Sequence, residues 1–118
     1  TRLAEATRAA VRHWGSDGKG PQLFCQTPDR LSNSVTTVVM PEGTSSDPLR
    51  KVAIDRYNLS LGGGLGPLMG KVFRIGHMGD LNEPMLLGCL ATTELAMKTA
   101  GVPFGPGGVD AAIDSLAN

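Results

Sequence analysis

The sequence predicts an α+β domain: a small antiparallel or mixed sheet with helices packed on one face. The chain has 118 residues, enough for one domain with one hydrophobic core. Apolar residues make up 41% and aromatic residues only 4%, so we expect a mainly aliphatic core. Helix-like and strand-like stretches follow in the order αββαββαα with short connections, which favours helices layered on a sheet.

The first half of the chain predicts a helix followed by two strands. Apolar residues recur at helical spacing over residues 3–14, and Gly15 follows them. Residues 22–26 form a short candidate strand. Residues 34–40 are rich in β-branched side chains and predict a longer strand.

A second helix is expected to begin at Asp47 and Pro48. Aspartate favours the capping position of a helix, and proline suits its first turn. The apolar face of this helix ends at Tyr57. Residues 59–61 then predict a short strand, and 71–78 a strand that follows a glycine-rich loop.

Two helices close the chain. Asn82 can cap the first of them, with Pro84 in its first turn, and Gly101 ends it. In the last helix, apolar residues at helical spacing predict one buried face, formed by Val109, Ala112, Ile113 and Leu116.

Arg74 is the main candidate functional residue, because it interrupts an otherwise apolar strand. A buried charge is costly without a partner, and the guanidinium group matches a carboxylate with two parallel hydrogen bonds. We therefore consider Arg74 a candidate binder of a small carboxylic acid. The alternatives are an arginine at the rim with a buried stem, or an internal ion pair with Asp80, Asp55 or another acid. Structural ion pairs also produce such arginines, so spacing alone favours these alternatives over carboxylate binding.

The glycine loop does not match known phosphate-binding motifs. A P-loop needs Ser or Thr after Gly-Lys, but Val72 follows Gly70 and Lys71, and Leu65 stands where its first glycine belongs. The dinucleotide motif should lead into a helix, whereas a strand follows here. The loop either lets a ligand approach the backbone closely or is simply a tight connection.

Composition argues against several other functions. Acidic and basic residues balance at 11 each, so no basic excess indicates nucleic acid. No apolar run is long enough to span a membrane, and no signal peptide opens the chain. Cys25 and Cys89 could form one disulfide, but two buried thiols are expected. Neither they nor His13 and His77 have the spacing of metal ligands, and no catalytic triad is legible.

Residues 62–82 resemble the carboxyl-terminal domain of the class V aminotransferases. The resembling residues are the run Gly-Gly-Gly-Leu-Gly followed by Gly-Lys-Val-Phe-Arg-Ile-Gly-His-Met-Gly-Asp-Leu-Asn. The strand residues 35–38 and the tail 100–113 extend the similarity over essentially the whole chain. The tail resembles the serine–glyoxylate branch in particular. The family comprises pyridoxal-phosphate enzymes that include alanine–glyoxylate and serine–glyoxylate aminotransferases.

The resemblance implies a function for the complete enzyme. Family members are homodimers that transfer an amino group from serine or alanine to glyoxylate. A large domain holds the pyridoxal phosphate, and the active site lies between it and the small domain. Arg74 would bind the substrate α-carboxylate, and the glycine loop with Gly64 and Leu65 would lie close to the substrate. The role of His77 stays open.

Most of such an enzyme is absent from the sequence. We expect residues 1–118 to be the small domain alone, detached from its large amino-terminal domain, because the chain starts at Thr1 apparently inside a helix. None of its lysines resembles the cofactor-binding lysine, so we expect this chain alone to neither bind the cofactor nor catalyse. We expect a cytoplasmic, bacterial enzyme. The alternatives are a free-standing module that binds a carboxylate, and a structural domain that mediates association.

Overall fold

The computed structural model describes residues 2–16, 18, 20–23, 35–41, 43–63, 70–76 and 83–117. Within these residues the elements follow the predicted order αββαββαα. They are α1 (Arg2–Trp14), β1 (Gln22–Leu23), β2 (Val35–Val39), α2 (Asp47–Tyr57), β3 (Gly62–Gly63), β4 (Val72–Gly76), α3 (Glu83–Ala100) and α4 (Gly108–Ala117).

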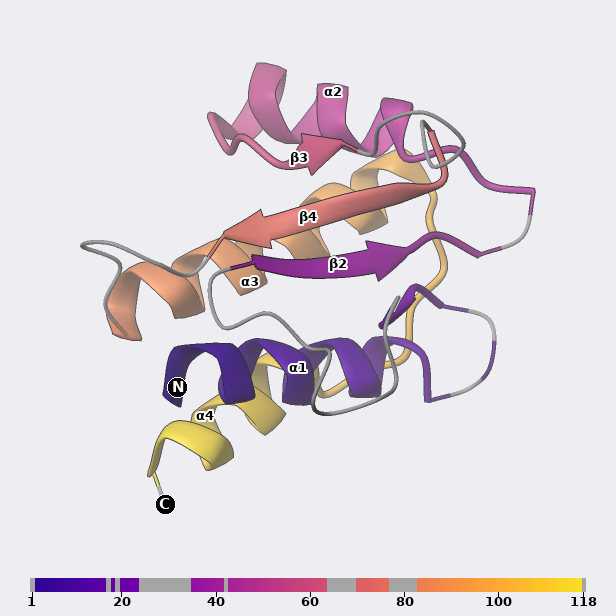
Figure 1. Ribbon diagram of the computed structural model, residues 1–118. Coiled ribbons are helices and arrows are strands. Elements are labelled where there is room, and N and C mark those ends of the chain that lie inside the picture. The colour runs from indigo at the N-terminus through magenta and orange to yellow at the C-terminus, as the bar shows by residue number, and fades with distance from the viewer. Residues whose placement is uncertain are drawn as a thin grey trace.

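The described strands form a four-stranded antiparallel sheet in the order β1-β2-β4-β3. The α+β prediction is confirmed, and the sheet is antiparallel rather than mixed. In Figure 1, α3 runs behind β2 and β4, while α1 lies along the β1 edge and α2 along the β3 edge. Strand β4 is central, so residues on it are held from both sides by backbone hydrogen bonds.

The core lies between one face of the sheet and the helices. Phe73 and Ile75 of β4 are at most 1% exposed and belong to the same buried cluster as Leu86 and Leu90 of α3. This agrees with the period of two expected for β4, which places Phe73 and Ile75 on one face and Arg74 on the other. The buried residues are mainly aliphatic, as the composition predicts.

A carboxylate joins three helices at the end of the molecule away from β3. Glu94 of α3 accepts a hydrogen bond from Trp14 Nε1 at 2.9 Å and another from the backbone N–H of Val109 at 3.2 Å. The second bond satisfies a free amide in the first turn of α4, where negative charge is favoured. Gly108 makes this arrangement possible, since a Cβ there would lie 2.4 Å from Trp14 Nε1.

The predicted strand 59–61 is wrong by a few residues. The backbone N–H of Leu59 donates to Ala53 at 2.9 Å, which ends α2 through Asn58 in the left-handed conformation. Leu59 is therefore part of the helix cap, and pairing with β4 begins only at Gly62.

The residue at the cap position of α2 is not the predicted one. Asp47 is the first residue of the helix, and Ser46 occupies the cap position without a side-chain capping bond. The Ser45 hydroxyl instead accepts from the Asp47 N–H at 3.1 Å. Pro48 does lie in the first turn, as expected.

The predicted buried face of α4 is only partly correct. Ala112 is fully buried, and Val109 and Leu116 pack against the core, but Ile113 is 45% exposed. The helical spacing predicted the helix correctly. It did not predict how much of the helix surface α1 and α3 would cover.

Cys89 of α3 is a free thiol that packs against the core. Burial raises its pKa, and the neighbouring Thr93 hydroxyl opposes this shift. A raised pKa keeps the thiol protonated at neutral pH and lowers its reactivity. Cys25 and the proposed cap Asn82 lie outside the described residues.

Replacing Glu94 with Ala should destabilise the fold. Two donors, Trp14 Nε1 and the Val109 N–H, would lose their acceptor, which typically costs about 1–3 kcal/mol for a group withdrawn from water. Urea unfolding followed by tryptophan fluorescence measures the change. Asp114→Ala, on an exposed position of α4, is the matched control. Equal midpoints for the two variants would show that the carboxylate does not join the helices.

Cys89 should react slowly with iodoacetamide in the folded chain. Because its pKa is raised, the rate should reach half its maximum above about pH 8.5, the ordinary cysteine value. Mass spectrometry of the peptide that contains Cys89, labelled with and without urea, measures the difference. A folded thiol that reacts as fast as the unfolded one contradicts its burial.

Candidate functional site

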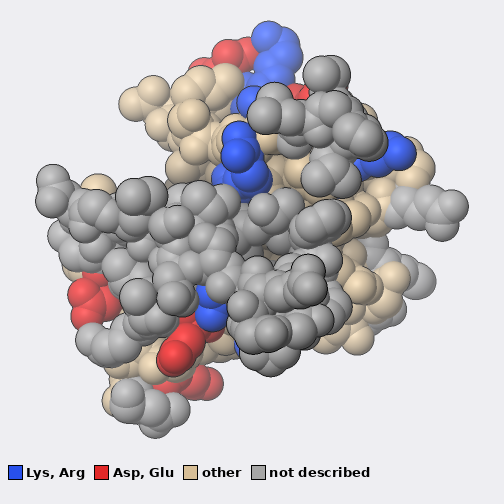
Figure 2. Space-filling model, in the orientation of Figure 1, with Lys and Arg blue, Asp and Glu red and all other residues tan. Residues whose placement is uncertain are grey.

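Arg74 is the third residue of β4 and lies between two strands. It pairs with Thr37 of β2 on one side and with Gly62 of β3 on the other. Its side chain is exposed, on the face opposite to Phe73 and Ile75. The central strand therefore fixes the backbone of Arg74 while the guanidinium group stays accessible. Figure 2 shows basic side chains at the surface of the face seen there, over the part that α2 and β4 occupy in Figure 1.

Gly62 leaves room for the Arg74 side chain. A Cβ at Gly62 would lie 3.1 Å from Nε and 3.3 Å from Nη2 of Arg74. A side chain at this position would require the Arg74 side chain to shift by a few tenths of an ångström, because such contacts are tighter than ordinary packing. The conformation of Arg74 thus depends on the absence of a side chain on its cross-strand neighbour.

The ion pair with Asp55, one alternative for Arg74, is not formed. Asp55 instead accepts from Lys51 at 2.8 Å, one turn away on the exposed face of α2. Within the described part of the chain, no acidic side chain forms an ion pair with Arg74. The second predicted partner, Asp80, lies outside the described residues. So do Gly64, Leu65 and His77. The roles predicted for Gly64 and Leu65 stay predictions, and the role of His77 stays open.

A second arginine, Arg50 of α2, contacts the chain at and just before β3. Its Nε donates to the backbone carbonyl of Leu61 at 3.0 Å, and a Cβ at Gly63 would lie 2.6 Å from its Nη1. The sequence pattern did not identify Arg50. Its partner is a backbone carbonyl, which leaves no signature in the sequence, and it adjoins the apolar stripe of an ordinary amphipathic helix.

The described lysines do not fit a pyridoxal-phosphate site. A lysine that forms a Schiff base needs a desolvated environment, which lowers its pKa. Lys51, Lys71 and Lys98 are exposed, and the carboxylate of Asp55 raises the pKa of Lys51. No step of cofactor chemistry is therefore assigned to these residues. Lys19 lies outside the described residues.

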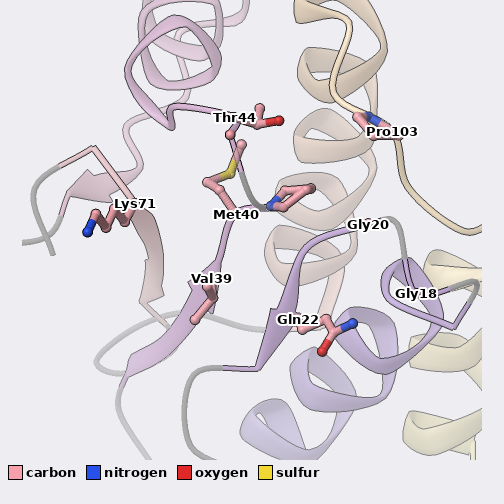
Figure 3. A pocket seen from close by; sticks show the side chains of 10 residues that line it. Gly18, Gly20, Gln22, Val39, Met40, Thr44, Lys71 and Pro103 are labelled. Carbon is pink, nitrogen blue, oxygen red and sulfur yellow. The ribbon is translucent and has the colours of Figure 1, made fainter.

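A pocket of about 900 Å³ lies at the carboxyl-terminal end of β2, where Val39 and Met40 line it (Figure 3). It is lined by Gly18, Gly20, Gln22, Val39, Met40, Pro41, Gly43, Thr44, Lys71 and Pro103. Among the described residues of this lining, Lys71 is the charged one, and these residues bring together no acid, base and nucleophile. Arg74 is not part of it, so we do not assign the substrate to this pocket.

Two further properties of the described residues concern metal ions and membranes. They contain no group of three or more side chains that could hold a metal ion. Among the helices that the structure describes, none is long and apolar enough to cross a membrane.

Comparison with known proteins identifies the family. No family model matches the chain. The chain is 45% identical over 113 residues to the serine–glyoxylate aminotransferase of Methylorubrum extorquens, covering 96% of this chain and 27% of that protein. It is 46% identical over 102 residues to the serine–glyoxylate aminotransferase of Arabidopsis thaliana, covering 86% of this chain and 24% of that protein.

A solved structure has the same fold. The ureidoglycine–glyoxylate aminotransferase of Bacillus subtilis superimposes with a TM-score of 0.85 at 25% identity, over 99% of this chain and 29% of that one. The chain thus spans roughly a quarter of the length of its curated relatives, at 27% and 24%. It belongs to the class V aminotransferases, the pyridoxal-phosphate enzymes that include serine–glyoxylate and alanine–glyoxylate aminotransferases, and represents a segment of them.

Proposed function

We propose that this chain is the carboxyl-terminal small domain of an aminotransferase that moves an amino group from serine or alanine to glyoxylate, and that Arg74 binds the substrate carboxylate. The observation that carries the proposal is the accessible guanidinium group of Arg74 on the central strand, with no ion-pair partner in the described residues. The names of the relatives support the reaction class, because they are glyoxylate aminotransferases.

The chemistry of Arg74 suits this role. Its guanidinium group is positively charged and presents paired N–H donors in one plane. Every amino-acid and keto-acid substrate of the reaction carries a carboxylate. Two parallel hydrogen bonds to that group fix both the position and the rotation of the substrate. Such a clamp orients the bonds at Cα toward the groups that react, which is the main contribution of a binding residue to rate.

The remaining parts of the active site are proposed to come from the rest of the enzyme. The large amino-terminal domain would supply the lysine and the other groups that bind pyridoxal phosphate, and the complete enzyme would be a homodimer. Gly64 and Leu65 directly follow β3 in the sequence, so they would lie near the substrate carboxylate. A bacterial origin and a cytoplasmic location stay expectations.

Arg74→Lys in the complete enzyme should lower kcat/KM for the amino donor by about 10- to 100-fold. A lysine keeps the charge but replaces the planar pair of donors with a single ammonium group, and hydrogen bonds to charged groups contribute about 1.5–3 kcal/mol. Steady-state kinetics with serine, alanine and glyoxylate measure the loss. Arg56→Lys, at an exposed position of α2, should have no effect. Wild-type kinetics for Arg74→Lys would exclude the clamp.

The 118-residue chain alone should not retain pyridoxal phosphate. Its exposed lysines can form only a reversible imine with the free cofactor, since their ammonium groups are well solvated. The purified chain is mixed with the cofactor, dialysed, and examined by visible absorbance and by borohydride trapping. Cofactor trapped on one specific lysine after dialysis would contradict the proposed division of roles between the domains.

A further inference from the structure

Strand β3 lies between two arginine side chains. Gly62 contacts Arg74, and the next residue, Gly63, contacts Arg50. Successive positions along a strand face opposite sides of a sheet, so the two guanidinium groups lie on opposite faces of β3. A Cβ at Gly63 would come within 2.6 Å of Nη1 and 2.8 Å of Cζ of Arg50, which places this group close against the strand.

Arg50 also binds the strand directly. Its Nε donates to the Leu61 carbonyl at 3.0 Å, immediately before β3 begins. β3 is at the edge of the sheet, where carbonyl groups lack a neighbouring strand to supply donors. A charged donor makes the stronger class of hydrogen bond. The competing ion pair with Asp47 is long, at 3.9 Å, and solvent-exposed, so it contributes little.

β3 needs such support because it is intrinsically weak. It consists of two glycines, which lose more backbone freedom on ordering than any other residue and bring no side chain to pack. Its hydrogen bonds to β4 hold one side. Arg50, which belongs to α2, holds the other side of β3. Helix α2 is in turn packed against α3, so the backbone that carries Arg50 is itself held in place.

We infer that Arg50 is a positioning residue for the substrate-binding arginine. It holds β3 against β4, and Gly62 of β3 defines the space in which the Arg74 guanidinium lies. Arg50 does not touch the substrate. Its loss allows β3 to shift, so that Arg74 no longer meets the carboxylate in a single orientation. This inference rests on the proposed role of Arg74.

The experiment compares two amino donors in the complete enzyme. Alanine carries the carboxylate, and ethylamine is the same molecule without it. The rate constant of the amino-transfer half-reaction is measured under single-turnover conditions for wild type, Arg50→Ala, Arg50→Lys and Arg74→Ala. Arg50→Ala should slow the reaction of alanine about tenfold at subsaturating concentration, because sub-ångström misplacement of a binding group already costs rate. Ethylamine, which has no group for Arg74 to hold, should react at an unchanged rate.

Matched variants separate positioning from general damage. Arg56→Ala removes an exposed arginine from the same helix, and Gly88→Ala adds a methyl group at a glycine with open space around it. Both should leave the rates unchanged. Gly63→Ala should resemble Arg50→Ala, since its methyl group displaces the Arg50 guanidinium. Combined with Arg50→Ala, it should add little, because both changes break the same link.

The outcomes distinguish this inference from the function on which it rests. If Arg74→Ala slows alanine selectively while Arg50→Ala and Gly63→Ala do not, Arg50 has no positioning role and the carboxylate clamp stands. If Arg74→Ala slows both amines equally, the clamp itself is wrong. If Arg50→Ala and Arg50→Lys slow both amines equally, or lower the melting temperature and cofactor content in proportion to the rate, Arg50 is only a structural residue.

Discussion

The pairing of β3 with β4 is the constraint on which the proposed site depends. It places Gly62, which has no side chain, directly opposite Arg74 on the central strand. The backbone of Arg74 is held on both sides, while the guanidinium group has room on the strand beside it. A bulky residue opposite would push the arginine away, and a loose edge strand would leave it without a fixed direction. In the sequence, the same short strand directly precedes the glycine loop.

The main helix packing and the proposed substrate site lie in different parts of the fold. The most extensive helix packing joins α1 to α4, and Glu94 ties both to α3 through Trp14 and Val109. Arg74 and Gly62 lie on β4 and β3, toward the edge of the sheet that contacts α2 rather than the edge that contacts α1. The proposed site therefore lies away from the packing that holds the helices together. Some glycines serve packing alone. At Gly108, Trp14 lies so close that there is no room for a Cβ.

Sequence reasoning predicted the regular elements well and their ends less well. Helical periodicity and β-branched runs reflect which face of an element is buried, and both can be recognised in the local sequence. The strand before the glycine loop was misplaced because the Leu59 amide closes the helix cap, a competition between two partners that the sequence does not reveal. Asp47 was assigned as the cap, but the neighbouring serine hydroxyl serves the local backbone instead.

The candidate site was predictable only in part, for a similar reason. The alternation along β4 correctly placed Arg74 on the face away from the core. Whether an acid would neutralise it depended on tertiary contacts, and Asp55 is bound to Lys51 instead. Arg50 was not foreseen, because its hydrogen bond is to a main-chain oxygen brought near by the turn after α2.

The most direct test of the account is a crystal structure of the complete enzyme with an amino-acid substrate bound. The account predicts two N–H···O contacts of about 2.7–2.9 Å between the Arg74 guanidinium and the substrate carboxylate, the length usual for charge-assisted pairs. It is contradicted if Arg74 is paired with a carboxylate of the enzyme itself while the substrate carboxylate is held by other residues.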